Sequence, residues 1–312
     1  MESFFIAFNA VMPMVLLAVI GYLMKLKGYF SDSNIGALNK ACFQVFLPIL
    51  TFRNISNSDI KSIFDLSLVF FACAIVIITI IVSIFVIPIF TKDKKNQGSL
   101  IQAIYRSNYV ILGLPIAYYL GGDLGQQIAS TLIMVIIPLY NVSAVIILSI
   151  YGGSSLNKKV IFISIIKNPL IISSILGIIV SLLGIQFPSF INATIKNFAS
   201  LGSIMPMLVL GASINLSRVT ANKKLLMIGM VSKLIVVPMI FIPISILLGY
   251  TNEKFIGLLI MLTAPPAVSS AVMAKEMGCN FELSTQLVVF STILSSLTVF
   301  FWIFLVSYLK LI

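Results

Sequence analysis

Long apolar runs follow one another along this chain, each about 20 residues long, which is the length that a helix needs to cross a bilayer. Short polar connections separate the runs. Hydrophobic residues make up 60% of the 312 residues and charged residues only 9%, which is far too apolar for a soluble domain of this size. We therefore predict an all-α polytopic membrane protein.

The apolar runs predict ten transmembrane spans in two sets of five. Because five is an odd number, the second set crosses the membrane in the opposite direction, which predicts one domain built as an inverted repeat of residues 1–152 and 158–312. A loop of glycine and serine at 152–155 joins the two repeats. The predicted spans cover residues 4–24, 35–52, 66–90, 101–120, 128–150, 161–183, 195–214, 225–248, 255–275 and 283–309.

The fourth span of each set is interrupted by proline. The first of these, IQAIYRSNYVILGLPIAYYL, contains Gly-Leu-Pro at 113–115, and the second, FIGLLIMLTAPPAVSSAVMAK, contains Ala-Pro-Pro at 264–266. Proline has no amide hydrogen and clashes with the preceding turn, so each helix is expected to break there. A break at membrane depth must lie inside protein or line a wet cavity, and paired breaks mark the binding sites of transporters.

The two breaks are expected to form an anion-binding site. Helices that restart after Pro115 and Pro266 would point free amides and partial positive charge at a carboxylate in the middle of the membrane. In the alternative interpretation, the serines and threonines only bond to carbonyls of their own helices and help the helices pack. The candidate substrate-binding residues are Ser107, Asn108, Gly113, Pro115, Thr263, Pro265, Pro266, Ser269 and Ser270.

Lys233 lies inside the eighth span, where an ammonium group needs a partner, a route to the interface or neutralisation. One interpretation makes Lys233 a coupling residue, either a fixed cation in place of sodium or a carrier of a proton. The other is that its side chain extends to the cytoplasmic interface.

The distribution of basic residues predicts the orientation of the chain. Of the 20 lysines and arginines, 14 fall in odd-numbered connections, with Arg106 counted among them, five fall in even-numbered connections and the C-terminus, and Lys233 lies in a span. By the positive-inside rule, the odd-numbered connections are cytoplasmic and both termini lie outside the cell membrane.

Several classes of protein and site are disfavoured by the residues present. The chain has no histidine, and its three cysteines are far apart, so no metal site or cofactor is expected. None of the nine acidic residues lies in the middle of a span, which disfavours an enzyme. The positive charge falls in short connections without interleaved aromatic residues, so we expect no nucleic-acid partner. A channel remains an alternative, because channels also contain broken helices.

Six segments stand out along the chain, in this order: LNKACFQVFLPILTF, RSNYVILGLPIA, KNPLIISSILGIIVSLLGIQFP, MPMLVLGASI, SKLIVVP and APPAVSSAVMAKEMG. Their order and spacing resemble the auxin efflux carrier family. The resemblance implies crossed broken helices four and nine and an elevator mechanism, in which spans 3–5 and 8–10 move against a scaffold of spans 1, 2, 6 and 7. It also implies secondary active efflux or exchange of small organic anions such as malonate, malate or an auxin-like carboxylate.

Two positions relate to the pattern of that family directly. Asn108 matches the asparagine that precedes Gly-Leu-Pro and is the first choice for a hydrogen bond to the substrate. The plant carriers pair a lysine at the position of Lys233 with an acid in span three, but this chain has Phe-Ala-Cys-Ala at 71–74. The paired arrangement, and proton coupling through a carboxylate, are therefore not expected here.

Two further expectations concern coupling and assembly. The main alternative function is a sodium-coupled organic-anion symporter of the bile-acid-transporter type, although the acidic sodium ligands usual near the broken helices are missing. An elevator carrier needs a stationary scaffold, so we expect a homodimer through spans 2 and 7. Gly211, Ala212 and Ser213 would allow close packing there.

Overall fold

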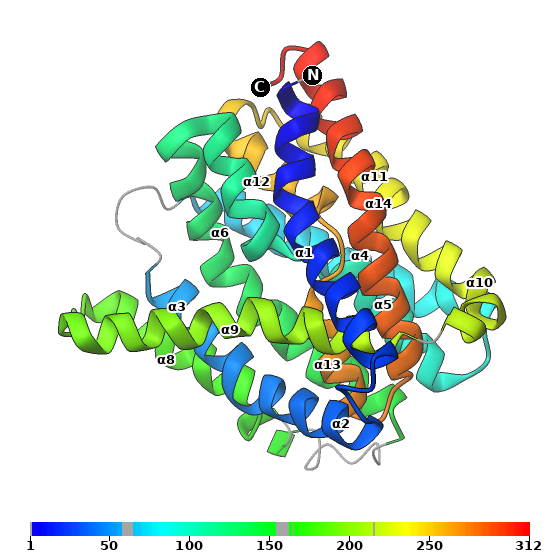
Figure 1. The fold of residues 1–312 in the computed structure, drawn as a ribbon. Helices are drawn as coiled ribbons and strands as arrows, with labels where there is room; N and C mark the ends of the chain where they lie inside the picture. Colours follow the sequence, from blue (N-terminus) through cyan, green and yellow to red (C-terminus); the bar gives the residue numbers. More distant parts are fainter. Residues whose placement is uncertain (1, 58–64, 154–161, 164, 215) are drawn as a thin grey trace.

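The computed structural model describes residues 2–57, 65–153, 162–163, 165–214 and 216–312, and every regular element in these ranges is a helix (Figure 1). The elements are α1 (Glu2–Leu26), α2 (Asp32–Ala41), η1 (Cys42–Phe46), α3 (Leu47–Ser56), α4 (Leu66–Phe90), α5 (Lys94–Tyr105), η2 (Tyr109–Gly113), α6 (Leu114–Tyr151), α8 (Pro169–Leu183), α9 (Ser189–Ser213), α10 (Leu216–Val231), η3 (Ser232–Val236), α11 (Val237–Leu247), α12 (Asn252–Thr263), α13 (Val268–Glu276) and α14 (Phe281–Tyr308). Part of the predicted loop between the repeats, with Lys158, lies outside the described residues.

The described helices support a multi-pass membrane protein. Six of them are long and apolar enough to cross a membrane, or seven if the bent pair α12 and α13, which meet at 45°, forms one span. Helix α4 has the same bounds as the predicted third span, and α6 contains the end of the fourth span and all of the fifth. Gly122 separates these two parts of α6, because its φ of 59° is not helical. Glycine adopts such an angle readily, since it has no Cβ atom. The arrangement as ten spans in two inverted repeats stays a prediction.

Three turns of π-helix, η1, η2 and η3, each lead into an α-helix whose second residue is proline, at Pro48, Pro115 and Pro238. Proline lacks an amide hydrogen and its ring clashes with the carbonyl four residues earlier, so a wider turn accommodates it without ending the helix. The prediction of a break at Gly113–Pro115 was therefore wrong. The break in this region lies at residues 106–108, between α5 and η2.

The two breaks in the chain are bonded to each other. Residues 264–267 separate α12 from α13, where the sequence predicted the second break. The backbone amide of Asn108 donates a hydrogen bond of 2.7 Å to the carbonyl of Pro265. Extended backbone inside the protein thus obtains a partner from the other broken helix, as buried polar backbone requires.

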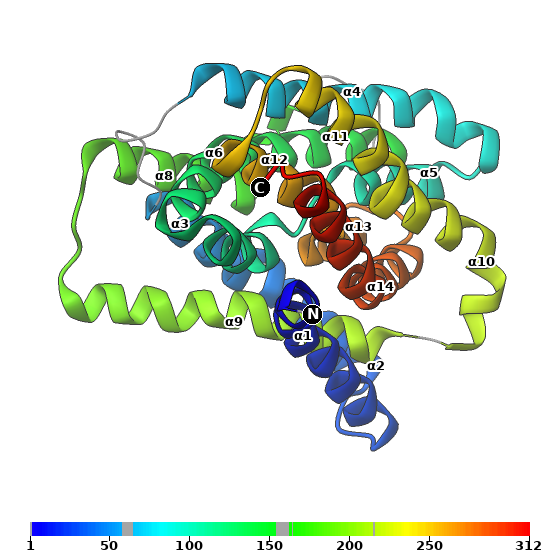
Figure 2. The ribbon, with the colours of Figure 1, turned by 90° about the horizontal axis from the view of Figure 1, so that it is seen from above.

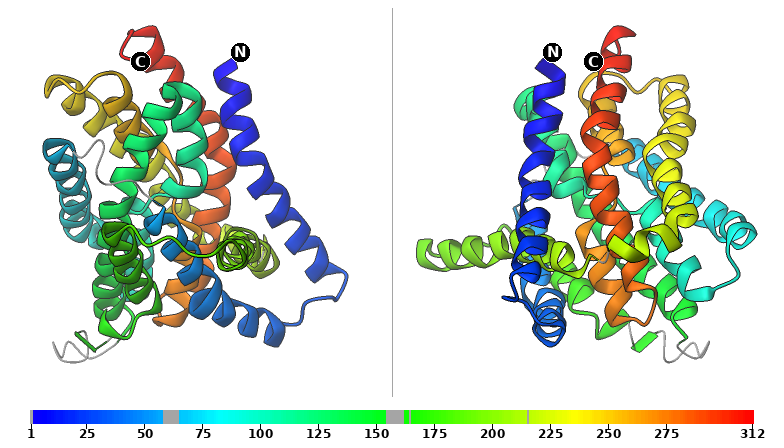
Figure 3. Two further views of the ribbon diagram at one scale, coloured as in Figure 1. Left: turned by 90° about the vertical axis from the view of Figure 1, so that its left-hand side faces the viewer. Right: turned by 45° about the vertical axis from the view of Figure 1, so that its right-hand side comes forward.

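The helices pack as two groups. Helix α3 packs against α8 and α9, and α1 packs against α9, while α4, α5, α6 and α10–α14 contact one another. Helix α1 also runs beside α14, and the chain ends at the start of α1 and the end of α14 lie at the same end of the molecule (Figures 1 and 3).

Small residues allow α1 and α9 to approach closely. A Cβ atom added to Gly211 would lie 2.0 Å from the carbonyl oxygen of Ala18, and one added to Gly21 would lie 2.0 Å from that of Leu208. Ala212 is fully buried as well. Gly211, one of the three small residues expected at a dimer interface, therefore packs against α1 inside one chain.

Candidate functional site

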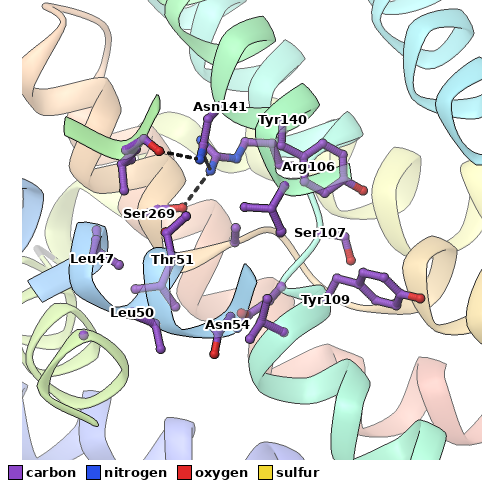
Figure 4. A pocket seen from close by; sticks show the side chains of 17 residues that line it. Leu47, Leu50, Thr51, Asn54, Arg106, Ser107, Tyr109, Tyr140, Asn141 and Ser269 are labelled. Carbon is purple, nitrogen blue, oxygen red and sulfur yellow. Dashed lines mark hydrogen bonds between the residues drawn. The ribbon is translucent and has the colours of Figure 1, made fainter. Parts of the chain in front are cut away.

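A small cavity lies where the two helix groups meet, beside the two breaks (Figure 4). Its volume is about 60 Å³, which is room for a few water molecules or for the carboxylate end of an organic anion. One wall comes from α3, α8 and α9, and the other from α6 and the two breaks. The lining residues are Leu47, Leu50, Thr51, Asn54, Arg106, Ser107, Asn108, Tyr109, Val110, Ile137, Tyr140, Asn141, Leu170, Gly202, Ala267, Val268 and Ser269.

Arg106 is the charged residue of this cavity, and only 3% of its surface is exposed. Its side chain lies beside Tyr140, Asn141 and Ser269 (Figure 4). Nη2 donates hydrogen bonds to the Asn141 Oδ1 at 3.0 Å and to the Ser269 Oγ at 2.9 Å. Nη1 donates to the Met273 sulfur, and Nε has no hydrogen-bond partner among the described residues. The guanidinium is thus held in place, and its Nε–H group makes no hydrogen bond to the described residues.

The positive charge of Arg106 is buried among neutral hydrogen-bond partners. All the groups in the described part of the chain that bond to Arg106 are neutral, and none is a carboxylate. A buried charge is costly unless it is paired, and an arginine at membrane depth usually marks a pathway for substrate or ions. The planar guanidinium matches the two oxygens of a carboxylate. The site therefore has a fixed positive charge suited to an anionic ligand.

Local structure explains why Arg106 points into the protein. Helix α5 ends at Tyr105, and the amide of Arg106 makes a last bond to the Gln102 carbonyl before the chain becomes extended. On the other side, the Asn141 Nδ2 donates to Ser174 Oγ at 3.3 Å, which leaves its Oδ1 facing Arg106. Asn141 therefore connects α8 to the guanidinium through one amide.

Three of the residues predicted from the sequence line the cavity, namely Ser107, Asn108 and Ser269. The hydroxyl of Ser107 is buried without a hydrogen-bond partner in the described structure, as is that of Ser270. The other predicted positions, Gly113, Pro115, Thr263, Pro265, Pro266 and Ser270, do not line it.

The structure gives local surroundings for three of the predicted residues that lie away from the cavity. Gly113 is buried, and a Cβ atom there would lie 2.7 Å from the Tyr109 ring and 3.0 Å from Ile260. The Thr263 hydroxyl donates to the Leu259 carbonyl of its own helix, as the alternative interpretation expected. Pro115 is exposed on the outside of α6.

Lys233 lies outside the cavity, in the π-turn η3. Only 1% of its surface is exposed, and η3 contacts α5, α12 and α14. No hydrogen bond or ion pair of the described residues joins Lys233 to an acid. A coupling role for Lys233 remains a proposal, and the described residues supply no acidic partner for it.

The sequence interpretation missed Arg106 by counting it among the basic residues of odd-numbered connections. Because the structure buries it beside the break, the odd-numbered count falls from 14 to 13. A signal was present, since Arg106 is the one charged residue in the apolar segment 101–120. In the described residues, no three histidine, cysteine, aspartate or glutamate side chains are grouped as metal ligands.

Comparison with known proteins agrees with this structural description. The family described as "Membrane transport protein" matches residues 6–303. An uncharacterized transporter of Methanothermobacter thermautotrophicus is 24% identical over 304 residues, which cover 94% of this chain and 96% of that protein. The uncharacterized transporter YfdV of Escherichia coli K12 is 20% identical over 314 residues, or 97% of this chain and 98% of YfdV. The chain therefore belongs to the membrane transport protein family, the auxin efflux carrier family that its sequence resembles.

Proposed function

We propose that this membrane transporter is a secondary active carrier of small organic anions and that the guanidinium of Arg106 binds the carboxylate. The observation that carries this proposal is a buried arginine beside two bonded helix breaks, with only neutral groups of the described chain as partners. The anion would supply the negative charge that the described residues bonded to Arg106 do not. Malonate, malate and an auxin-like carboxylate are the substrates to test.

The neutral polar residues of the cavity would orient the anion. Ser107 offers a hydroxyl without a partner, and Asn108 brings an amide to the same wall. Ser269 already bonds to Arg106 and would share the carboxylate with it. Apolar residues from α3, α6 and α8 would contact the rest of the anion.

Transport would proceed by an elevator movement of one helix group against the other. Both groups contribute to the cavity, since α3, α8 and α9 form one wall and α6 with the breaks forms the other. A relative movement would therefore carry the site and open it to either side, which supports efflux or exchange by alternating access. A homodimer through spans 2 and 7 would hold the group of α1, α3, α8 and α9 still, although Gly211 itself packs against α1 in the same chain.

Binding and transport can be tested on the same variants. Calorimetry in detergent with malonate, malate and indole acetate should detect binding to the parent protein and much weaker binding to Arg106→Gln. Lys40→Gln is the matched control, because it removes one positive charge from an exposed site on α2. Uptake into proteoliposomes with and without sodium tests the symport alternative. Equal anion affinity in Arg106→Gln and the parent would contradict the proposal.

A further inference from the structure

A second polar pocket lies where α3 ends, between the end of α8 and the start of α9, and its volume is about 390 Å³. Figure 2 shows the connection from α8 to α9 at this edge of the molecule, away from α12–α14. Arg53 is half-buried there, and no acid in the described part of the chain forms an ion pair with it. The polar lining residues are Arg53, Ser56, Asn57, Ser181, Gln186 and Asn192.

An apolar groove of about 480 Å³ adjoins this pocket, and Phe52 and Ile195 line both. The remaining lining of the groove is Pro48, Ile49, Ser173, Leu176, Thr194 and Phe198. The two hydroxyl groups among these residues donate to carbonyls of their own helices. The groove is therefore apolar along its whole length. It opens on the surface of the molecule, where Leu176 is 50% exposed.

The polar pocket and the apolar groove together form one composite site. Helix α3 separates this composite site from the cavity at Arg106. Positions 47, 50, 51 and 54 face the cavity, while positions 49, 52, 53 and 56 line the pocket and groove. These two sets follow helical spacing, so they occupy different faces of one helix. No residue lines both the cavity and the composite site.

We propose that the composite site binds one phospholipid with an anionic headgroup. The phosphate lies at Arg53, the headgroup bonds to the amides and hydroxyls of the polar pocket, and an acyl chain occupies the groove. The cation of the polar pocket and the adjoining apolar groove match the charged headgroup and the acyl chain of such a lipid. A free phosphate would leave the groove uncovered. Such a lipid would fix the outer face of α3, whose inner face forms the anion cavity.

Native mass spectrometry of protein purified with phosphatidylglycerol or phosphatidylcholine tests this site independently of transport. We expect retention of phosphatidylglycerol by the parent and a loss of roughly tenfold or more in lipid affinity for Arg53→Gln, since one charge-assisted hydrogen bond is removed. Leu176→Trp, which fills the groove, should weaken both lipids. Lys196→Gln, an exposed charge change on α9, should behave as the parent does.

Thermal stability measurements separate the possible ligands. Phosphatidylglycerol should raise the Tm of the parent and of Lys196→Gln, and sn-glycerol 3-phosphate, which has the headgroup phosphate but no chain, should not. The proposal is overturned if Arg53→Gln retains phosphatidylglycerol as well as the parent does, or if the parent prefers neither lipid. If Leu176→Trp dissociates a dimer but leaves lipid retention unchanged, the proposal is overturned, and the groove binds a second copy of the chain instead.

Discussion

Replacement of Arg106 by glutamine is the sharpest test of the anion site. The two Nη atoms already bond to Asn141, Ser269 and Met273, while Nε is buried without a partner in the described structure. Nε can therefore donate to an anion without breaking an existing bond. A hydrogen bond to a charged group contributes about 1.5 to 3 kcal/mol, so its loss should weaken anion binding by roughly ten- to a hundredfold.

The assay combines calorimetry with thermal unfolding. At a concentration of 100 times its Kd, a bound anion stabilises the folded state by about 2.7 kcal/mol, which raises the Tm of the parent and of Lys40→Gln. At the same concentration, Arg106→Gln should show little increase. Arg106→Lys keeps the charge but loses the planar pair of donors, so its affinity should lie between those of the parent and the glutamine variant.

The outcomes distinguish loss of binding from loss of folding. If Arg106→Gln is monodisperse and unfolds cooperatively without anion but is not stabilised by it, Arg106 binds the anion. If the glutamine and lysine variants both bind as tightly as the parent, the guanidinium has a structural role and the reasoning from its buried charge is refuted. A lysine variant as weak as the glutamine variant would show that donor geometry matters more than charge.

Three further predictions concern other parts of the chain. Asn108→Ala should weaken anion binding by roughly ten- to a hundredfold in calorimetry, while its backbone bond to the second break is kept, so folding yield should be unchanged. Gly211→Val should lower the Tm strongly, because even a Cβ atom would lie 2.0 Å from the Ala18 carbonyl oxygen. Cysteines at Lys94 and Asp123 should be labelled from the cytoplasm and from outside, respectively, and the reverse pattern would contradict the predicted orientation.

The presence of several long apolar helices was predictable because it depends on local composition. A run of apolar residues from 66 to 90 must satisfy its backbone internally, and α4 has the predicted bounds. The second break was predictable for the same reason, since adjacent prolines at 265 and 266 remove two amide donors. The first break was not, because a π-turn accommodates Pro115, and the extended segment 106–108 is held by a bond to Pro265, far away in the sequence.

The binding residues were predictable only in part. Ser107, Asn108 and Ser269 lie close to the breaks in the sequence and also line the cavity. The contribution of Asn141 depends on how α6 packs against α8, which no local pattern reveals. Arg106 was missed because it was counted among the basic residues of the odd-numbered connections, although it lies in the predicted span 101–120. Its position inside an otherwise uncharged segment was the better guide.

The charge of Arg106 also bears on the mode of transport. In the proposed elevator cycle, Arg106 would belong to the moving helix group, so it would return either paired with an anion or as a bare cation. A charged side chain at the centre of a bilayer costs about 2.5 to 3.5 kcal/mol or more; where the bare guanidinium meets this cost in the transition state of the return step, the anion-free carrier would return on the order of a hundredfold more slowly. Exchange should therefore be faster than net efflux. Proteoliposomes loaded with labelled malonate should release it much faster when unlabelled malonate is outside, and equal rates with and without external anion would show that the guanidinium is neutralised by another route.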